Sequence, residues 1–141
     1  MIGKIRITLD KGAYSPVRAY PTDAGMDLIT PCPVLIEPHS EAVIDTGVHM
    51  EIPAGYWGKI ESKSGLNIKH SIVSLGGTID SGYTGSIKVK LYNLSNWPYK
   101  FQTGEKVAQL VIGPCETPEL EIVDSLEATE RGNGGFGSTG K

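Results

Sequence analysis

The last residues of the chain, Arg131 to Gly140, combine groups that suit a ligand carrying both negative charge and a flat ring. They hold one guanidinium, one aromatic ring, two hydroxyls and five glycines, too little apolar surface to build a core. Glycine amides can approach phosphate oxygens closely, Arg131 can donate two parallel hydrogen bonds, and Phe136 can stack on a base. The segment is therefore either a mobile lid over such a ligand or an ordinary disordered tail.

A second segment with chemical potential runs from Gly76 to Gly85. Its paired glycines leave the main chain open to the edge of a base, Asp80 is placed to act as a general base, and Tyr83 offers a face to a sugar. The Asp80-Ser81-Gly82 sequence is also a good hairpin turn. The residues of this segment leave both interpretations open.

Three further positions carry polar groups in suggestive places. Lys63 and Ser64, beside Gly65 just after a predicted strand, suit phosphate binding, although a polar turn has the same composition. Asp27 lies in what we expect to be a loop beside Gly25. Its carboxylate could belong to a functional site, and the alternative is an ordinary loop aspartate without a chemical role. Gln109 interrupts an apolar run, an odd place for an amide unless it has a partner.

Several classes of site are excluded by missing patterns. Gly58-Lys59 is followed by Ile60 rather than by serine or threonine, so the chain has no P-loop. The three histidines lack partners at zinc-ligand spacing, and no serine-hydrolase elbow is present. Thirteen Lys+Arg against sixteen Asp+Glu give a net charge of -3, so we expect neither a nucleic acid nor a membrane as partner.

Short strands must position these groups. Residues 4–9 and 86–92 alternate between apolar and polar side chains, and six further β-type runs lie at 34–36, 42–44, 48–52, 56–60, 106–112 and 120–123. Eighteen glycines and nine prolines leave little room for a long helix. The pattern favours an all-β fold, a sandwich, jelly roll or small barrel, over residues 1–126, followed by a flexible glycine-rich arm over residues 127–141.

Cysteine usage and the N-terminus indicate the compartment. Cys32 and Cys115 form no CxxC pair, so we expect free buried thiols rather than a disulfide. The chain shows no apolar run of signal-peptide or membrane-spanning length. We expect a soluble intracellular protein, cytoplasmic in a bacterial or viral host, with the nucleus as the alternative in a eukaryotic or viral one.

Five segments, in this order, resemble the motifs of the trimeric dUTP pyrophosphatases (dUTPases). The family patterns Ala-Gly-x-Asp-Leu, Arg-Ser-Gly-Leu and Gly-x-Ile-Asp-x-x-Tyr-x-Gly match residues 24–28, 63–66 and 77–85, with Lys63 in place of the arginine. The pattern Gly-Asp-Arg-x-x-Gln-Leu matches 104–110 with conservative changes at Glu105 and Lys106, and the terminal Arg-Gly-x-Gly-Gly-Phe-Gly-Ser-Thr-Gly is complete at 131–140. The resemblance covers residues 23–140, nearly the whole chain.

This resemblance implies a hydrolase that converts dUTP to dUMP and pyrophosphate, which supplies dUMP for dTMP synthesis and keeps uracil out of DNA. Asp80 would be the general base for a water that attacks the α-phosphorus. The resemblance also implies the substrate contacts. Uracil would bind the main chain at Gly77, Thr78, Ile79 and Asp80 with help from Ser74, and deoxyribose would lie on Tyr83. The phosphates would bind Lys63, Ser64, Gly65, Gln109 and Arg131. Phe136 would stack on uracil, the triphosphate would accept hydrogen bonds from Gly137, Ser138 and Thr139, and Lys88 would complete the substrate site.

The resemblance further implies a jelly-roll-like β-barrel and a homotrimer with active sites shared between subunits. Mg²⁺ would be the cofactor, held by the triphosphate and water with no direct protein ligand, and Asp27 would act only in the outer shell. Lys63 is the departure that matters, because lysine lacks the planar fork of arginine and the phosphate grip or subunit packing would differ.

Two rival functions use the same fold or pocket. The dCTP deaminases have a catalytic glutamate and an additional arginine near the serine-containing motif, and residues 65–68, Gly-Leu-Asn-Ile, offer neither. A dUTPase-like regulatory protein that binds nucleotide without turning it over is the other rival. Assays of nucleotide hydrolysis with identification of the products separate the three.

Overall fold

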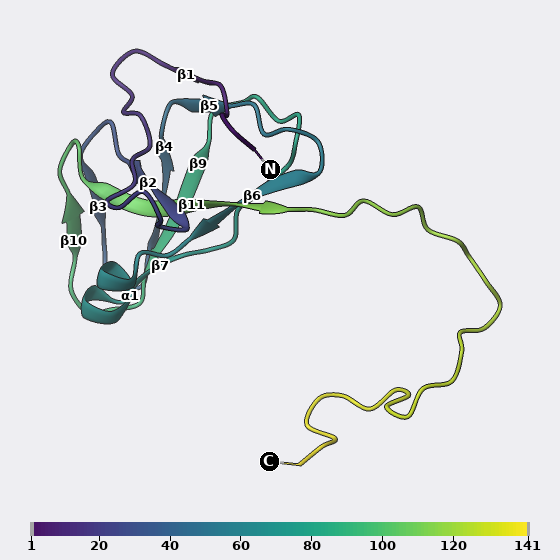
Figure 1. Ribbon diagram of the computed structural model, residues 1–141. Helices are drawn as coiled ribbons and strands as arrows, with labels where there is room; N and C mark the ends of the chain where they lie inside the picture. The colour runs from purple at the N-terminus through teal and green to yellow at the C-terminus, as the bar shows by residue number, and fades with distance from the viewer. Residues whose placement is uncertain (1, 141) are drawn as a thin grey trace.

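In the computed structural model, which describes residues 2–140, strands dominate and the helical content is one short element (Figure 1). The elements in chain order are β1 (Ile7–Leu9), β2 (Gly25–Ile29), β3 (Val34–Ile36), β4 (Glu41–Asp45), β5 (Val48–Met50), β6 (Tyr56–Glu61), α1 (Ser64–His70), β7 (Ile72–Ser74), β8 (Thr78–Ile79), β9 (Lys88–Asn93), β10 (Tyr99–Phe101) and β11 (Lys106–Pro114). The turns between strands use glycine where the backbone turns left-handed, as at Gly82 with φ of +83°.

The strands form two larger sheets and two small pairs, all antiparallel. One sheet has the order β2-β11-β6-β8 and the other β4-β9-β7, and β1 pairs with β5 and β10 with β3. The all-β, jelly-roll-like prediction is confirmed. Within residues 2–140, however, the strands do not close into a barrel, because several are only two or three residues long and their ladders end before the next sheet.

The core forms where the alternating faces of the larger sheets meet. In β9, Val89, Leu91 and Asn93 are buried while Lys88 and Lys90 are exposed, which is the pattern of a half-buried strand. The buried Asn93 amide is satisfied, because it donates to the carbonyl oxygens of Ile36 at 3.0 Å and Trp97 at 2.7 Å. The loops that connect the strands are therefore attached to a packed core whose buried amide is hydrogen-bonded.

Two sequence-based assignments are wrong. Residues 24–28 lie largely in β2 rather than in a loop, and Asp27 stands opposite Gln109 of β11. A buried strand position for a carboxylate is unusual and depends on charge partners, described below. The run at 120–123 is not a strand, since no described segment pairs with it, and Leu120 and Ile122 are 93% and 98% exposed.

The thiol prediction is confirmed in one respect and wrong in the other. Both cysteines are free, but Cys32 is exposed and Cys115 is half-buried, so neither is a core residue. Each cysteine directly follows a proline at a point where the chain leaves a strand. Segments that connect strands run over the surface, which explains why neither thiol is buried. Over residues 2–140, no helix is long and apolar enough to cross a membrane.

Beyond β11 the chain leaves the sheets as one extended segment (Figure 1). The ribbon from about residue 115 onward runs away from the β body and then turns through short bends near the C-terminus. The large apolar side chains of this segment, Leu120, Ile122, Leu126 and Phe136, are all exposed. The arm thus contributes nothing to the core of its own chain.

Candidate active site

A small cavity of about 270 Å³ gathers six of the predicted substrate-site residues. Its lining is Gly77, Thr78, Ile79, Asp80, Tyr83, Ser86 and Lys88. A larger cavity of about 550 Å³ lies beside the N-terminal segment and contains none of the predicted residues. The lining of the larger cavity includes the cations Lys4 and Arg18 but no carboxylate, whereas the smaller cavity brings together the carboxylate of Asp80 and the ammonium of Lys88. The smaller cavity is therefore the candidate site.

The floor of this cavity depends on Gly77. Its φ is +117°, and a Cβ built on it would lie 2.8 Å from Cβ of Ile60 in β6. The Gly77 carbonyl oxygen accepts a hydrogen bond of 2.8 Å from the Ile60 amide, so the main chain is drawn against β6. A glycine is the residue that fits both the backbone angle and the approach. The result is exposed main chain at Gly77 and Thr78, free to contact a flat ligand edge.

Asp80 and Tyr83 occupy the turn after β8. The Tyr83 amide donates to the Asp80 carbonyl oxygen at 3.2 Å, which closes the turn, and Asp80 itself is exposed. The Tyr83 hydroxyl donates to the Ser86 carbonyl oxygen at 3.0 Å, and its ring covers Gly85. The ring is therefore held by the following backbone, while the carboxylate is open to water.

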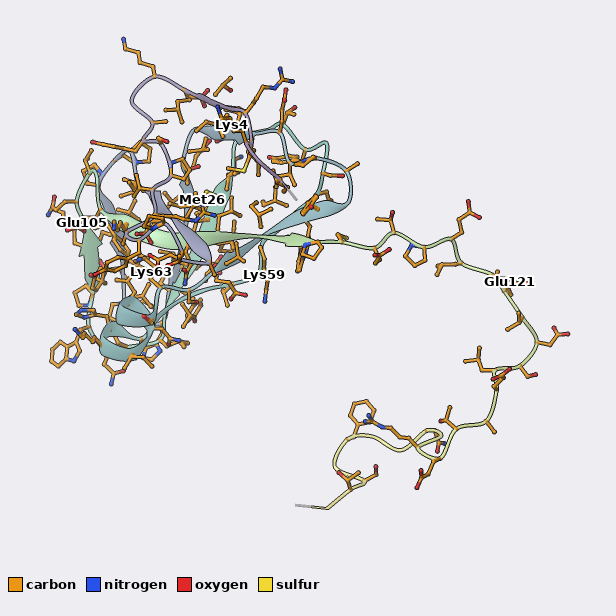
Figure 2. All side chains as sticks on the ribbon, in the orientation of Figure 1. Lys4, Met26, Lys59, Lys63, Glu105 and Glu121 are labelled. Carbon is orange, nitrogen blue, oxygen red and sulfur yellow. The ribbon has the colours of Figure 1, made fainter. Side chains whose placement is uncertain are left out.

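A second polar group lies around Asp27 of β2, the edge strand of the four-stranded sheet, and includes Lys63, which Figure 2 labels on the β body. Asp27 Oδ1 pairs with the Lys63 ammonium, and Oδ2 lies 2.7 Å from Nζ of Lys106. Burial of Asp27 acts to raise its pKa, but the hydrogen bonds and charges of Lys106 and Lys63 outweigh burial, and the pKa falls below its ordinary value. The two ion pairs thus explain how a carboxylate is tolerated in a strand, and they show that the ammonium of Lys63 contacts Asp27.

The Gln109 amide has the partner that its position in an apolar strand demanded. Its Nε2 donates to the Ser62 carbonyl oxygen at 3.1 Å, and its side chain fills the space left by the missing Cβ of Gly25. The Ser62 hydroxyl in turn accepts a hydrogen bond of 2.8 Å from the Ser74 amide. These contacts connect β11, the end of β6 and β7, and fix the backbone that leads to Lys63.

Ser64 and Gly65 form the first turn of α1 and are both exposed. Lys63 is the N-cap residue of this helix and provides no side-chain cap, because an ammonium has no acceptor for the helix amides; its Nζ pairs with Asp27. A turn was the alternative expected at this place, and the helix replaces it. The amide groups of the first turn remain unbonded by the helix and face solvent.

Comparison with known proteins gives one consistent result. A family model described as dUTPase matches residues 11–140. The deoxyuridine 5'-triphosphate nucleotidohydrolase of Anaeromyxobacter sp. (strain Fw109-5) is 41% identical over 142 residues, covering 98% of this chain and 97% of the relative. That of Mus musculus is 37% identical, covering 96% of this chain and 83% of the relative.

The chain belongs to the dUTPase family.

Solved dUTPases have the same fold as this chain. A mutant of the Staphylococcus bacteriophage 80alpha dUTPase with dUpNHpp superposes with a TM-score of 0.92 at 34% identity, covering 99% of this chain and all of that one. A dUTPase mutant from phage phi11 of S. aureus, at 32% identity and a TM-score of 0.83, is described with a structural Mg(II) ion. Five motifs found in the sequence thus lie on a fold shared with dUTPases.

The arm residues of this dUTPase are not brought to the Asp80 cavity within one chain. Arg131 turns back on its own segment, with Nε donating to the Gly134 carbonyl oxygen at 2.9 Å. Phe136 is fully exposed with a left-handed φ of 52°, and the stretch Gly137–Thr139 is exposed beside it. Figure 1 shows this yellow end of the ribbon well away from the β body.

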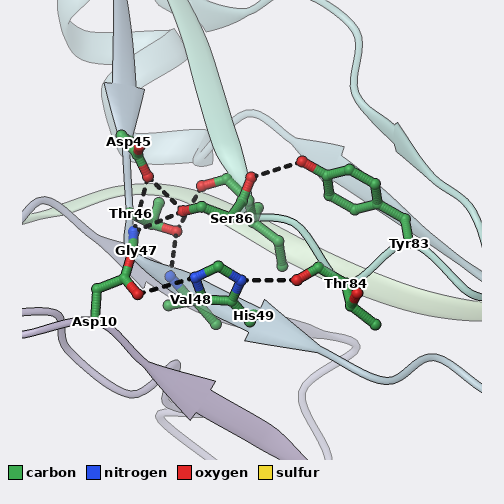
Figure 3. A network of polar contacts seen from close by, with 10 residues as sticks. Asp10, Asp45, Thr46, Gly47, Val48, His49, Tyr83, Thr84 and Ser86 are labelled. Atoms are coloured by element: carbon green, nitrogen blue, oxygen red, sulfur yellow. Dashed lines mark hydrogen bonds and ion pairs between the residues drawn. The ribbon is translucent and has the colours of Figure 1, made fainter.

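A polar network that no sequence pattern predicted lies around Ser86 and Thr84, next to Tyr83 (Figure 3). Asp45 Oδ1 accepts hydrogen bonds from the Ser86 hydroxyl and, at 3.1 Å, from the Gly47 amide. His49, in β5, contacts both Asp10 and Thr84. The sequence signal was weak: a polar Ser86 and a histidine within otherwise apolar strand patterns, far apart along the chain.

Proposed function

We propose that this protein hydrolyses dUTP to dUMP and pyrophosphate, with Asp80 as the general base. The observation that carries the proposal is the Asp80 cavity, where an exposed carboxylate stands between open main chain at Gly77 and Thr78 and the ring of Tyr83. Membership of the dUTPase family supports the substrate. The curated relatives named above are deoxyuridine 5'-triphosphate nucleotidohydrolases.

In the proposed reaction, the Asp80 carboxylate accepts a proton from a water molecule as that water attacks the α-phosphorus. A new P–O bond forms to the water oxygen, the bond from the α-phosphorus to the bridging oxygen breaks, and pyrophosphate leaves with the electron pair. An aspartate is a weak base, but an oriented water close to the phosphorus compensates for this weakness. The exposure of Asp80 leaves room for that water.

Selectivity would come from the cavity walls. The main chain from Gly77 to Asp80 would hydrogen-bond the uracil edge, with Ser74 nearby, since its hydroxyl donates to the Gly76 carbonyl oxygen at 3.4 Å. The ring of Tyr83 would lie under deoxyribose and leave no room for a 2′-hydroxyl. A wrong base would leave buried polar groups unpaired, which penalises its binding.

The phosphates would bind cationic and amide groups of the Asp80 cavity and of the segment around Lys63. Lys88 lines the Asp80 cavity, and exposed Ser64 and Gly65 offer the amides of the first turn of α1. Lys63 and Gln109 would contribute from the Asp27 cluster, although both already have protein partners there. We propose that Asp27 acts here by orienting Lys63 rather than by approaching a metal.

Mg²⁺ fits this site as a partner of the triphosphate. Residues 2–140 contain no cluster of three or more histidine, cysteine or carboxylate side chains that would hold a cation by themselves. Both oxygens of Asp27 face ammonium groups, so any outer-shell contact from Asp27 would run through water. When bound with the nucleotide, the ion would neutralise charge on the phosphate oxygens.

We propose a homotrimer in which the arm of one subunit closes the site of another. The exposed Leu120, Ile122 and Leu126 support an intersubunit role, because three large apolar side chains on one extended segment call for a covering surface. In the closed state Arg131 would bind the distal phosphates and Phe136 would stack on uracil. The stretch Gly137–Thr139 would donate to the triphosphate.

The test is a hydrolysis assay with dUTP, UTP, dTTP and dCTP in the presence of Mg²⁺, with all products identified. The proposal predicts dUMP and pyrophosphate from dUTP and far lower rates with the other three nucleotides. Release of ammonia from dCTP would identify a deaminase instead. Tight nucleotide binding without turnover would identify a regulatory binding protein.

A further inference from the structure

His49 lies between two groups that can only accept hydrogen bonds (Figure 3). Its Nδ1 is 2.7 Å from the Thr84 carbonyl oxygen, and its Nε2 is 3.0 Å from Oδ1 of Asp10. A neutral imidazole has a single N–H, so it can satisfy one of these acceptors and not the other. Only the imidazolium donates at both nitrogens. The geometry therefore selects the charged form of the ring.

The Asp10 end of this bridge is fixed by the main chain. The Asp10 amide donates to the Gly47 carbonyl oxygen at 2.9 Å, and the Asp10 carbonyl oxygen closes a turn with the Ala13 amide at 3.0 Å. Gly47 has φ of +68°, and a Cβ there would lie 3.2 Å from Cβ of Asp10. The turn after β1 is thus packed directly onto the start of β5. The main chain that carries the Asp10 carboxylate is therefore held beside His49.

The Thr84 end belongs to the segment that carries the substrate contacts. This segment, Asp80 to Ser86, is anchored at its end by the Ile87 amide, which donates to the Val48 carbonyl oxygen at 2.8 Å. Among residues 2–140, two side chains from other strands hydrogen-bond this segment: His49 of β5 bonds the Thr84 carbonyl oxygen, and Asp45 of β4 accepts from the Ser86 hydroxyl at the end of the segment. The bond from His49 is the one nearer to Tyr83 in sequence. Tyr83 precedes that bonded carbonyl directly.

From this geometry we infer that His49, as an imidazolium, is a positioning residue for the Tyr83–Ser86 loop at Thr84 and thereby contributes to discrimination between deoxyribose and ribose. The inference rests on the proposed function of Tyr83. With Thr84 fixed, the ring of Tyr83 keeps its place over Gly85. With Thr84 released, the ring gains freedom and the space for a 2′-hydroxyl opens.

The charges around His49 favour this state. Asp10 and Asp45 face it from the turn after β1 and from β4, and Lys88 stands opposite Asp45 in the sheet register. Arg6 and Glu51, which line the adjoining cavity of about 300 Å³, pair with each other at 2.7 Å. The Thr84 carbonyl oxygen, first, and then Asp10 raise the pKa of His49 above 6.5. The double bridge is therefore present at lower pH and is lost as pH rises through that raised pKa.

The test measures the ratio of kcat/KM for dUTP to kcat/KM for UTP across pH. A pH effect on a step common to both substrates cancels in this ratio. We expect wild-type selectivity to fall about tenfold at high pH, roughly the effect of losing one charge-assisted hydrogen bond. His49→Gln should have the lower ratio at every pH, without a transition. Asp10→Asn should move the transition to lower pH, which a purely structural role for His49 would not do.

His39→Asn is the matched control, because it removes an exposed imidazole that contacts Asn96, outside this network. It should retain the wild-type pH profile. The ring nitrogen spectrum of His49 gives a measurement that needs no turnover: both nitrogens should be protonated at pH 6, and Asp10→Asn should lower the pKa. Absence of dUTP turnover in the wild type would contradict the proposed function alone. A selectivity transition that survives in His49→Gln, or a neutral ring at pH 6, would overturn the inference.

Discussion

Replacing Asp27 with asparagine should destabilise the protein, because the carboxylate holds two lysines at the β2–β11–β6 edge. Asp27→Asn keeps the shape of the side chain and removes its charge. The Asp27 side chain is 10% exposed, whereas Lys63 and Lys106 are 27% and 43% exposed. The cluster is therefore neither fully buried nor fully solvated, and its two ammonium groups would be left without a counter-ion.

The expected loss in the free energy of unfolding lies between the values for a fully exposed and a fully buried ion pair. Exposed ion pairs contribute about 0–1 kcal/mol, and removing one partner of a buried pair costs about 3–5 kcal/mol. For this half-solvated cluster we expect about 2 kcal/mol. With a slope of about 2 kcal/mol per M, that corresponds to a shift of about 1 M in the urea midpoint. In a thermal scan it corresponds to roughly 4–8 °C.

The assay is urea unfolding of the variant and wild type at one fixed protein concentration, since assembly would couple stability to concentration. Asp124→Asn, the same substitution on the exposed C-terminal segment, is the control and should unfold like the wild type. The pKa of Asp27 is lowered in the folded state, so its stabilisation is complete above the unfolded value of 3.8 and is lost as pH falls through the lower folded value.

The gap between wild type and Asp27→Asn should therefore be largest near neutral pH and shrink below pH 3.8. Equal midpoints at pH 7 would refute the reasoning that the lysines depend on Asp27. A gap that widens with acid would refute the sign of the pKa shift. A raised KM for dUTP in the variant would connect the cluster to phosphate binding through Lys63.

Three other predictions concern the Asp80 cavity and the arm. Asp80→Asn should lower turnover by roughly two to four orders of magnitude, while calorimetry should show near-normal binding of a non-hydrolysable dUTP analogue. Near-normal turnover of this variant would show that Asp80 serves only to form the turn. Gly77→Ala should abolish hydrolysis by displacing the cavity floor, since its Cβ would lie 2.8 Å from that of Ile60, and a crystal structure with the loop unmoved would contradict this. Deleting residues 131–141 should leave the thermal midpoint almost unchanged and eliminate most activity. Full activity of the truncated protein would show that the tail is an ordinary disordered segment with no role in hydrolysis.

Much of the fold followed from periodicity and turn residues. The alternation at residues 86–92 predicted β9, and the glycines and prolines correctly limited helix to a short element. The motifs were equally visible, because residue types at fixed spacing are a property of the sequence. The segment from Gly77 to Tyr83 could therefore be nominated as one site, and the structure places Gly77, Thr78, Ile79, Asp80 and Tyr83 around one cavity.

Tertiary structure alone decided the electrostatic partners. Asp27 looked like a loop residue because it lies close to Gly25 and follows the turn-forming residues 21–23, and only the folded chain brings Lys63 and Lys106 to its two oxygens. The same holds for the partner of Gln109 and for the His49 bridge, whose members lie 35 and 39 positions apart along the chain. Local sequence determines which strands and turns can form, through short-range sterics and burial patterns. Which charges meet is set by sheet pairing across long separations, and no local pattern encodes that pairing.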